Sequence, residues 1–299
     1  MNLITIIKCN EGWIECLKTL DDGRLAAGDE YSNLIIYNKE TFNPDIIIQN
    51  NLDELFNFTQ LKNKNIACSF YRYSTLKIIN INNNNENENQ IIKNIHNDNI
   101  SKIIELKNEN LITFSYDCSF KIWKLNNNNK YEKINEFKDS NCLSDGIEIK
   151  DNEILYALYG DITQSLVFYS LNNNKTIKTI NNLKLYVFCA GNRIIKLNNN
   201  EVAVAGDKKV YLIDINNYSI LNEINSDCLN WCILKLSNNL FLTGDDNGTI
   251  TQYKIENKKL IKESYKNKSH ENWIPSMTIL NDMIISGNGS KNEIKFWKK

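Results

Sequence analysis

Short apolar stretches alternate with polar turns along the whole chain. Each stretch is about five to seven residues long, is rich in Ile, Val, Leu, Phe and Tyr, and ends at Asn, Asp, Gly or Ser. Apolar residues do not keep a helical spacing over the ten or so positions that would indicate a helix. The pattern predicts an all-β fold built from short strands.

These stretches group into a repeat of three strands whose last strand ends in an aromatic residue. The copies lie at residues 11–38, 51–80, 96–124, 142–169, 189–214, 230–254 and 270–298. An aliphatic landmark precedes the first turn of each copy, at Leu20, Leu61, Leu106, Ile149, Leu197, Leu236 and Leu280. The landmarks are on average about 43 residues apart, the length expected of a four-stranded propeller blade.

The repeat predicts one seven-bladed β-propeller over residues 1–299, with no second domain. The expected blades are approximately 11–50, 51–95, 96–140, 141–185, 186–228, 229–268 and 269–299. The last copy lacks a fourth strand, whereas residues 2–8 precede the first copy and have no blade to join. We expect residues 2–8 to complete the last blade and close the ring, which leaves only short sheet edges.

Residues at fixed places in the repeat resemble those of the WD40 family. His96, Ser115, Asp117 and Trp123 match the family's structural His–Ser–Asp–Trp set, which the resemblance implies is hydrogen-bonded within one blade. His270 and Trp297 match two of the four. Other copies depart from the set, with Tyr37, Tyr169 and Tyr253 in the place of Trp, and Tyr31, Tyr73 and Lys291 in the place of Asp. The resemblance implies a WD40-type propeller that binds other macromolecules.

Composition narrows the function. Lys and Arg total 35 against 36 Asp and Glu, a net charge of −1, so nucleic acid is not the expected partner. The eight cysteines are scattered without a CxxC pair, which indicates free thiols in an intracellular, cytoplasmic setting, with the nucleus as the alternative. No stretch has the length of a membrane span, and we expect no membrane insertion.

Candidate chemistry is sparse. The two histidines, His96 and His270, both occupy the structural position of the repeat, so none is left for a general base or a metal ligand. The acidic stretch at residues 245–248 reads as a hairpin turn rather than a calcium loop. The sequence has no phosphate-binding loop motif. We expect no enzyme activity, no cofactor, no metal and no small-molecule substrate.

In a WD40 blade, the resemblance implies, the loop before the first strand and the loop between the second and third strands open on one face of the ring. The Asn runs 82–85, 126–129, 172–174 and 198–200 then fall on the opposite face. Low-complexity turns of this kind tolerate sequence drift when they contact nothing. We therefore expect partners to bind the other face.

Three tryptophans, Trp13, Trp231 and Trp273, stand at the entrances of the first, sixth and seventh blades, which are neighbours in a closed ring. They predict either an aromatic binding surface or packing in the seams between blades. Trp123 and Trp297 end third strands and are predicted to be core. The charged residues expected on this face are Glu30, Asp245 and Asp246, which make the sector acidic, and Arg72 and Arg193.

Two hypotheses remain for this sector. Either it binds a peptide or loop with apolar and basic residues, or its charges are ordinary solvated turn residues. The leading function is a non-catalytic scaffold or adaptor that binds proteins or peptides, and the alternative is a constitutive structural subunit of a large intracellular complex. A lipid-binding propeller is disfavoured because the chain has no Arg-Arg pair.

Overall fold

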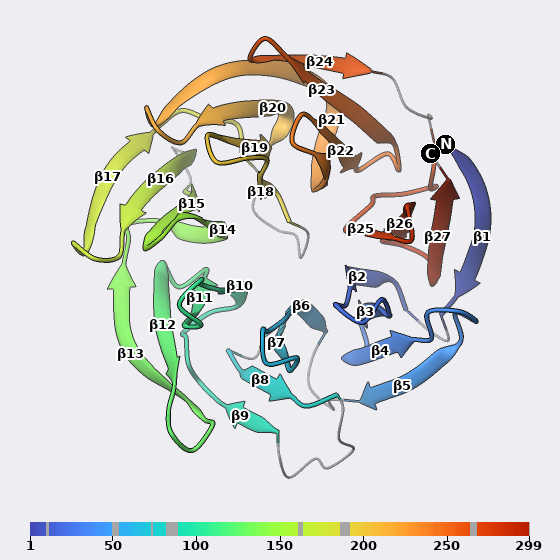
Figure 1. Ribbon diagram of the computed structural model, residues 1–299, viewed down its shortest axis with the longest axis horizontal. Helices are drawn as coiled ribbons and strands as arrows, with labels where there is room; N and C mark the ends of the chain where they lie inside the picture. Colours follow the sequence, from blue (N-terminus) through green and yellow to red (C-terminus); the bar gives the residue numbers. More distant parts are fainter. Residues whose placement is uncertain are drawn as a thin grey trace.

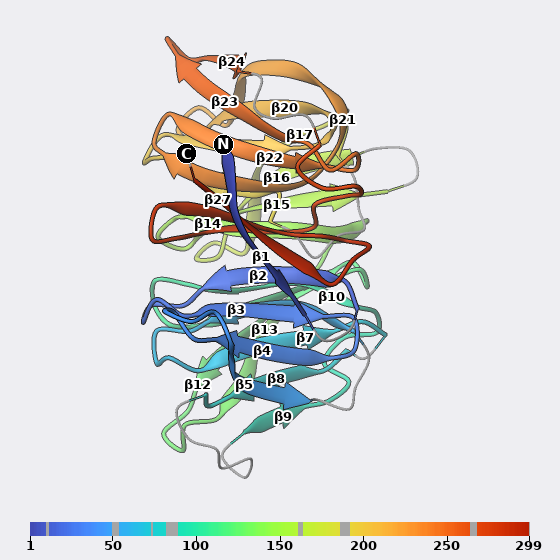
Figure 2. The same ribbon diagram turned by 90° about the vertical axis from the view of Figure 1, so that its right-hand side faces the viewer.

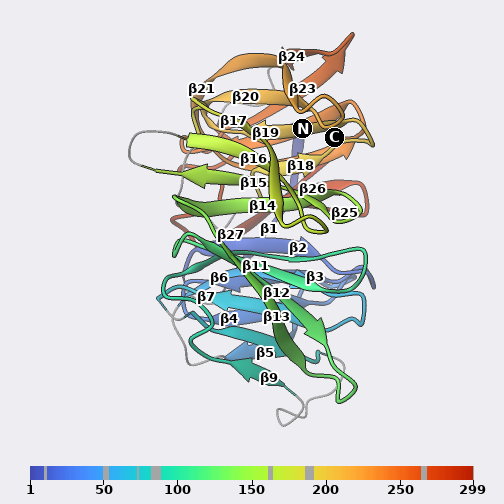
Figure 3. The same ribbon diagram turned by 90° about the vertical axis from the view of Figure 1, so that its left-hand side faces the viewer.

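The strands form a ring of small β-sheets around a central axis (Figure 1). The computed structural model describes residues 1–9, 12–49, 54–72, 74–81, 89–160, 164–185, 192–263 and 268–298. Seen from the side, the ring is a disc whose strands run between two opposite faces (Figures 2 and 3). Neighbouring strands in every sheet pair antiparallel, as in the third blade.

The first four blades are separate four-stranded sheets, each running from an inner to an outer strand in sequence order. The first holds β2 (Ile14–Thr19), β3 (Leu25–Asp29), β4 (Asn33–Tyr37) and β5 (Pro44–Gln49). The second holds β6 (Leu55–Gln60), β7 (Ile66–Phe70), β8 (Leu76–Ile79) and β9 (Gln90–Ile92). The third holds β10 (Ile100–Glu105), β11 (Leu111–Ser115), β12 (Ser119–Leu125) and β13 (Tyr131–Lys138). The fourth holds β14 (Cys142–Lys150), β15 (Glu153–Tyr159), β16 (Gln164–Ser170) and β17 (Lys175–Ile180).

One long strand joins the fifth and sixth blades. β21 (Ser219–Ser237) pairs with β20 through its first part and with β22 through its second part. The fifth blade therefore holds β18 (Ile194–Lys196), β19 (Glu201–Ala205), β20 (Asp207–Asp214) and the start of β21. The sixth holds the end of β21 with β22 (Leu240–Asp245), β23 (Ile250–Glu256) and β24 (Lys259–Glu263).

The N-terminal strand closes the ring. β1 (Asn2–Lys8) pairs with β27 (Glu293–Lys298), so the last blade has the order β1-β27-β26-β25, with β26 at Met283–Gly287 and β25 at Met277–Leu280. The two chain ends consequently lie side by side (Figure 1). The Cys9 amide donates to the Asn292 carbonyl at 2.7 Å directly after β1. The predicted closure is confirmed, and the described residues form seven blades when β21 is counted in both of its sheets.

Seven hydrophobic clusters fill the seams between adjacent blades, one cluster for each seam. The closing seam packs Ile14 and Leu25 of the first blade against Phe296 of the last. The landmark residues Leu61 and Leu106 belong to these clusters, and each is only 1% exposed. Because each blade buries one sheet face against each neighbour, the core is a ring of apolar layers.

Candidate protein-binding face

The loops of the propeller are sorted onto two faces by strand direction. We call entry face the side with the loops before each first strand and the loops between second and third strands, and turn face the opposite side. The Asn runs at 126–129, 172–174 and 198–200 connect first to second or third to fourth strands, so they lie on the turn face. The run 82–85 lies outside the described residues, as does Tyr73. The polar loops thus gather opposite the entry face.

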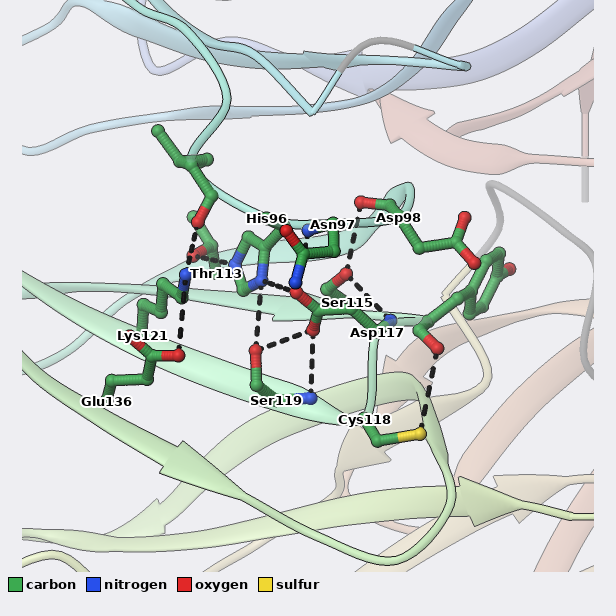
Figure 4. A network of polar contacts seen from close by, with 12 residues as sticks. His96, Asn97, Asp98, Thr113, Ser115, Asp117, Cys118, Ser119, Lys121 and Glu136 are labelled. Carbon is green, nitrogen blue, oxygen red and sulfur yellow. Dashed lines mark hydrogen bonds and ion pairs between the residues drawn. The ribbon is translucent and has the colours of Figure 1, made fainter.

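A buried polar network spans the third blade (Figure 4). His96 Nε2 contacts Thr113 Oγ1 at 2.8 Å, and the Trp123 indole N–H donates to the same oxygen at 3.0 Å. The other imidazole nitrogen, His96 Nδ1, lies 3.0 Å from Asp117 Oδ2. Burial alone would raise the pKa of Asp117, but hydrogen bonds from His96, Ser119 and a backbone amide outweigh it and hold that pKa well below its usual value. The network ties β11, β12 and the loop between them to the entry loop of the blade.

The side-chain hydroxyl in this network is that of Thr113. The prediction that Ser115 supplies it is therefore wrong. The Ser115 hydroxyl donates instead to the Asp98 carbonyl at 3.2 Å and accepts the Asp117 amide at 3.1 Å. Both residues point to one side of β11 because they are two positions apart. Thr113 is nearer the Trp123 indole along the strand, so it receives the indole N–H.

The last blade contains a shorter version of the network. Ser286 Oγ lies 2.7 Å from His270 Nε2 and accepts the Trp297 indole N–H at 2.7 Å. The His270 ring is buried, and burial together with the charge of Lys295 lowers its pKa to about 3. His270 is therefore neutral at physiological pH.

In the first and sixth blades, which have no histidine, an aspartate caps the loop between the second and third strands. Asp29 Oδ1 accepts the amides of Tyr31 at 3.0 Å and Asn33 at 2.8 Å. Asp245 Oδ1 does the same for Asn247 at 3.0 Å and Thr249 at 2.8 Å. Asp245 is 7% exposed, so the structure removes it from the predicted binding surface and makes it a turn residue.

The three loop tryptophans meet on the entry face. The Trp13 and Trp273 rings are edge to face with centroids 6.4 Å apart, and the Trp273 and Trp231 rings are tilted with centroids 5.9 Å apart. All three side chains are partly exposed. Trp231 lies within β21 rather than in an entry loop, because that strand is continuous between blades. The predicted aromatic group, here called the Trp cluster, thus spans three blades.

Local contacts fix the positions of the indoles. The Trp13 indole N–H donates to the Glu15 carboxylate. The Trp273 ring covers Gly289, where a Cβ atom would come within 2.0 Å of its Nε1. Because Gly289 has no side chain, the Trp273 indole can pack directly against its backbone.

Carboxylates surround the Trp cluster. Burial raises the pKa of Glu15 to about 7, and the nearby charges of Glu54 and Glu30 act in the same direction, while the bond from Trp13 opposes them. Glu30 is partly exposed, and its amide donates to the Trp13 carbonyl at 3.3 Å. Asp246 is exposed. Glu30 and Asp246 are thus the accessible carboxylates of this sector, whereas Asp245 is buried and the raised pKa of Glu15 weakens its charge at neutral pH.

The two predicted arginines have different surroundings. Arg72 is exposed on the entry face, where its guanidinium lies 5.7 Å from the centre of the Tyr71 ring. Arg193 is 5% exposed, and its amide donates to Asp145 Oδ2 at 2.7 Å. The structure therefore excludes Arg193 from the exposed surface, because it is buried directly before the inner strand β18.

The entry face has a second aromatic group that was not predicted from the sequence. Phe56 lies 5.9 Å from Tyr71 and 6.4 Å from Tyr116 between ring centroids, and Cys142 and Tyr159 pack against them. These residues come from the second, third and fourth blades. Each stands at a strand end, where a lone aromatic residue gives no repeating signal. Only the closed ring brings them together.

The described residues contain no group of three or more His, Cys, Asp or Glu side chains that could hold a metal ion. Within the same ranges, no helix is long and apolar enough to cross a membrane.

Comparisons with known proteins agree on the architecture. No protein-family model matches the sequence, and no curated protein matches it significantly. The solved structure of U3-55K superposes with a TM-score of 0.81 at 13% identity, covering 99% of this chain and 98% of that one. The crystal structure of the RRP9 WD40 repeats gives a TM-score of 0.79 at 14% identity, covering 98% and 96%. Together with the blade topology and the His96 network, this similarity shows that the chain folds as a WD40 β-propeller.

Proposed function

We propose that the chain is a non-catalytic interaction scaffold that binds partner proteins or peptides through the Trp cluster on its entry face. The observation that carries this proposal is the contact of three partly exposed indoles from three adjacent blades. Tryptophan is one of the residues enriched at the energetic centres of protein interfaces. Indoles held by neighbours also lose little conformational entropy when a partner binds.

The charges beside the Trp cluster support a partner segment with apolar and basic residues. Glu30 and Asp246 are accessible, and neither forms an ion pair within the described ranges. An arginine or lysine of the partner would complement these carboxylates while its apolar neighbours covered the indoles. Both histidines are held in the cores of their blades, which supports a binding function rather than catalysis.

The proposal predicts that Trp13→Ala, Trp231→Ala and Trp273→Ala together remove the partners that co-purify with the tagged wild-type chain. Quantitative mass spectrometry after affinity purification from native lysate measures the loss. A matched variant with Asn127→Ala, Asn128→Ala and Asn173→Ala on the turn face should keep them. Partners retained by the folded tryptophan variant would refute the proposal.

Gly289→Ala gives an independent test that keeps all three indoles. The added methyl group would displace Trp273, so we expect a reduced yield of the same partners with an intact fold by circular dichroism. If the triple variant unfolds while Gly289→Ala binds normally, the tryptophans are seam packing and the binding proposal is wrong.

The alternative of a constitutive complex subunit is favoured by the outer rim. Exposed apolar side chains occur on the outer strands of six blades, at Leu3, Ile4, Ile6, Ile47, Ile91, Ile134, Ile220 and Ile261. Partner subunits around the rim would remove these apolar side chains from water. Sedimentation of native lysate separates the two functions, because an adaptor has a free pool of about 35 kDa and an obligate subunit has none.

A further inference from the structure

The centre of the ring contains a cavity of about 410 Å³, lined by both charged and apolar side chains. The inner strands β2, β6, β10, β14 and β18 surround it (Figure 1). Four lysines line it, namely Lys18, Lys102, Lys107 and Lys196. Its volume lies within the range of small-molecule sites. This cavity is separate from the Trp cluster and from the function proposed above.

The two carboxylates that line the cavity are engaged by the turn-face loops. Glu105 Oε2 accepts the Lys62 amide at 2.8 Å, and Glu148 Oε2 accepts the Lys107 amide at 2.7 Å. Each of these bonds links one blade to the first turn of the preceding blade. The two carboxylates are thereby held at the cavity rim.

Lys102 reaches across the channel. Its ammonium donates to Asn192 Oδ1 and lies 3.5 Å from Asp145 Oδ1. The Asp145 carboxylate also accepts the amides of Arg193 at 2.7 Å and Ile194 at 3.0 Å. Lys102 is thus paired with a buried carboxylate whose second oxygen is occupied by backbone donors, which holds the ammonium at the channel wall.

Lys18 adds a second cation to the same channel. Its ammonium donates to Thr59 Oγ1 at 2.7 Å, and in the described part of the chain it forms no ion pair. Burial, followed by repulsion from Lys102, lowers the pKa of Lys18 to about 8. An anion in the channel would relieve both effects, because it would supply the missing opposite charge.

We propose that this central cavity is a binding site for a small phosphate-type oxyanion, with the ammonium groups of Lys18 and Lys102 as its charge contacts. The Thr59 hydroxyl accepts from Lys18 and so has its own proton available for an anion oxygen. The Asn192 side-chain N–H2 group is a further donor at the cavity wall. Lysine ammonium groups bind phosphate oxygens as point charges.

Titration calorimetry with inorganic pyrophosphate, in a buffer free of other multivalent anions, tests the site. We expect saturable binding at one site per chain. Lys18→Gln should weaken it by about tenfold or more, whereas Lys18→Arg should keep it within about threefold. Lys64→Gln is the control, because Lys64 is an exposed lysine of the turn face that pairs with Asp21. Parallel titrations with inorganic phosphate and a phosphate monoester distinguish a free-anion site from an ester site.

A second measurement uses the wild-type chain alone and so does not depend on the folding of any variant. Lysines are acetylated briefly with acetic anhydride, with and without pyrophosphate, and mapped by mass spectrometry. Pyrophosphate should protect Lys18 and leave Lys64 unprotected. The absence of saturable binding to the wild type, equal affinity of Lys18→Gln, or equal labelling of Lys18 in both samples would each overturn the proposal.

Discussion

One buried hydroxyl holds the polar network of the third blade together. Thr113 Oγ1 is the shared partner of the His96 ring and the Trp123 indole, and the residue is fully buried. A buried donor that loses its partner costs more than the bond itself contributes, because it was removed from water. The network therefore stabilises the blade only while all its members are present.

Thr113→Val should lower the free energy of unfolding by about 2–4 kcal/mol, since it leaves His96 Nε2 and the Trp123 N–H without their partner. Ser115→Ala removes a hydroxyl that bonds only to the backbone, and we expect a loss of about 1 kcal/mol. Urea unfolding of the two variants measures the difference. Equal losses would show that the network does not depend on Thr113.

Glu15 should make stability depend on pH. Its pKa rises from 4.5 to about 7 on folding, so between these values the folded chain keeps a proton that the unfolded chain releases. The free energy of unfolding contributed by Glu15 therefore falls as the pH rises from 4.5 to 7. Glu15→Gln should stabilise the chain by about 1–2 kcal/mol at pH 8 and have little effect at pH 4.5. The exposed Glu40→Gln is the control, and thermal unfolding curves that shift equally at both pH values for Glu15→Gln would contradict the assignment.

At the scale of strands, the apolar pattern was sufficient to predict the blades. Six of the seven landmark residues are buried at the end of an inner strand, and Leu236 is partly buried. Several of the turns that follow contain a residue at positive φ, such as Gly23 at 83° or Lys64 at 71°. The continuity of β21 could not be predicted, since polar residues such as Asn225 and Asp227 resemble a turn in sequence. They remain extended because the strand passes directly from one blade to the next.

Two site residues were predicted in the wrong environment because their burial depends on local contacts that the sequence pattern does not show. The sequence suggests that Asp245 and Arg193 are exposed loop charges, yet Asp245 caps its own turn and Arg193 is buried, with its amide bonded to Asp145. Charge type alone does not report burial, because a buried polar group needs only local partners. The Trp cluster was predictable because its three members occupy equivalent places in a repeat.

Ring closure depends on one strand from the opposite end of the chain. Removal of residues 2–8 would leave the β27 edge unpaired, including its contacts at Ile294 and Phe296. We expect the free energy of unfolding of the truncated chain to fall by at least about 3 kcal/mol, which lowers the urea concentration at its unfolding midpoint. We also expect the truncated chain to associate through the open edge. A synthetic peptide of residues 2–8 should partly restore the unfolding midpoint. An unchanged midpoint without the peptide would contradict this role for β1.

For the whole molecule, the closed ring separates surfaces of different character. The entry face carries the Trp cluster, its carboxylates and the Phe56 group, whereas the turn face carries the Asn-rich loops. The central channel adds a cationic cavity between the two faces. A rigid disc can present these surfaces together because its stability comes from the seams between blades, which leaves the loops available for partners.

Site-specific photo-crosslinking tests the binding face most directly. Benzoylphenylalanine is placed at Tyr31, which is 57% exposed beside Glu30 on the entry face, or at Asn127 on the turn face. After irradiation in cells, we predict covalent partner adducts from position 31 and none from position 127, and these adducts should disappear when Trp273→Ala is added. Adducts from position 127 alone, or adducts from position 31 that survive Trp273→Ala unchanged, would contradict the assignment of the Trp cluster as the binding surface.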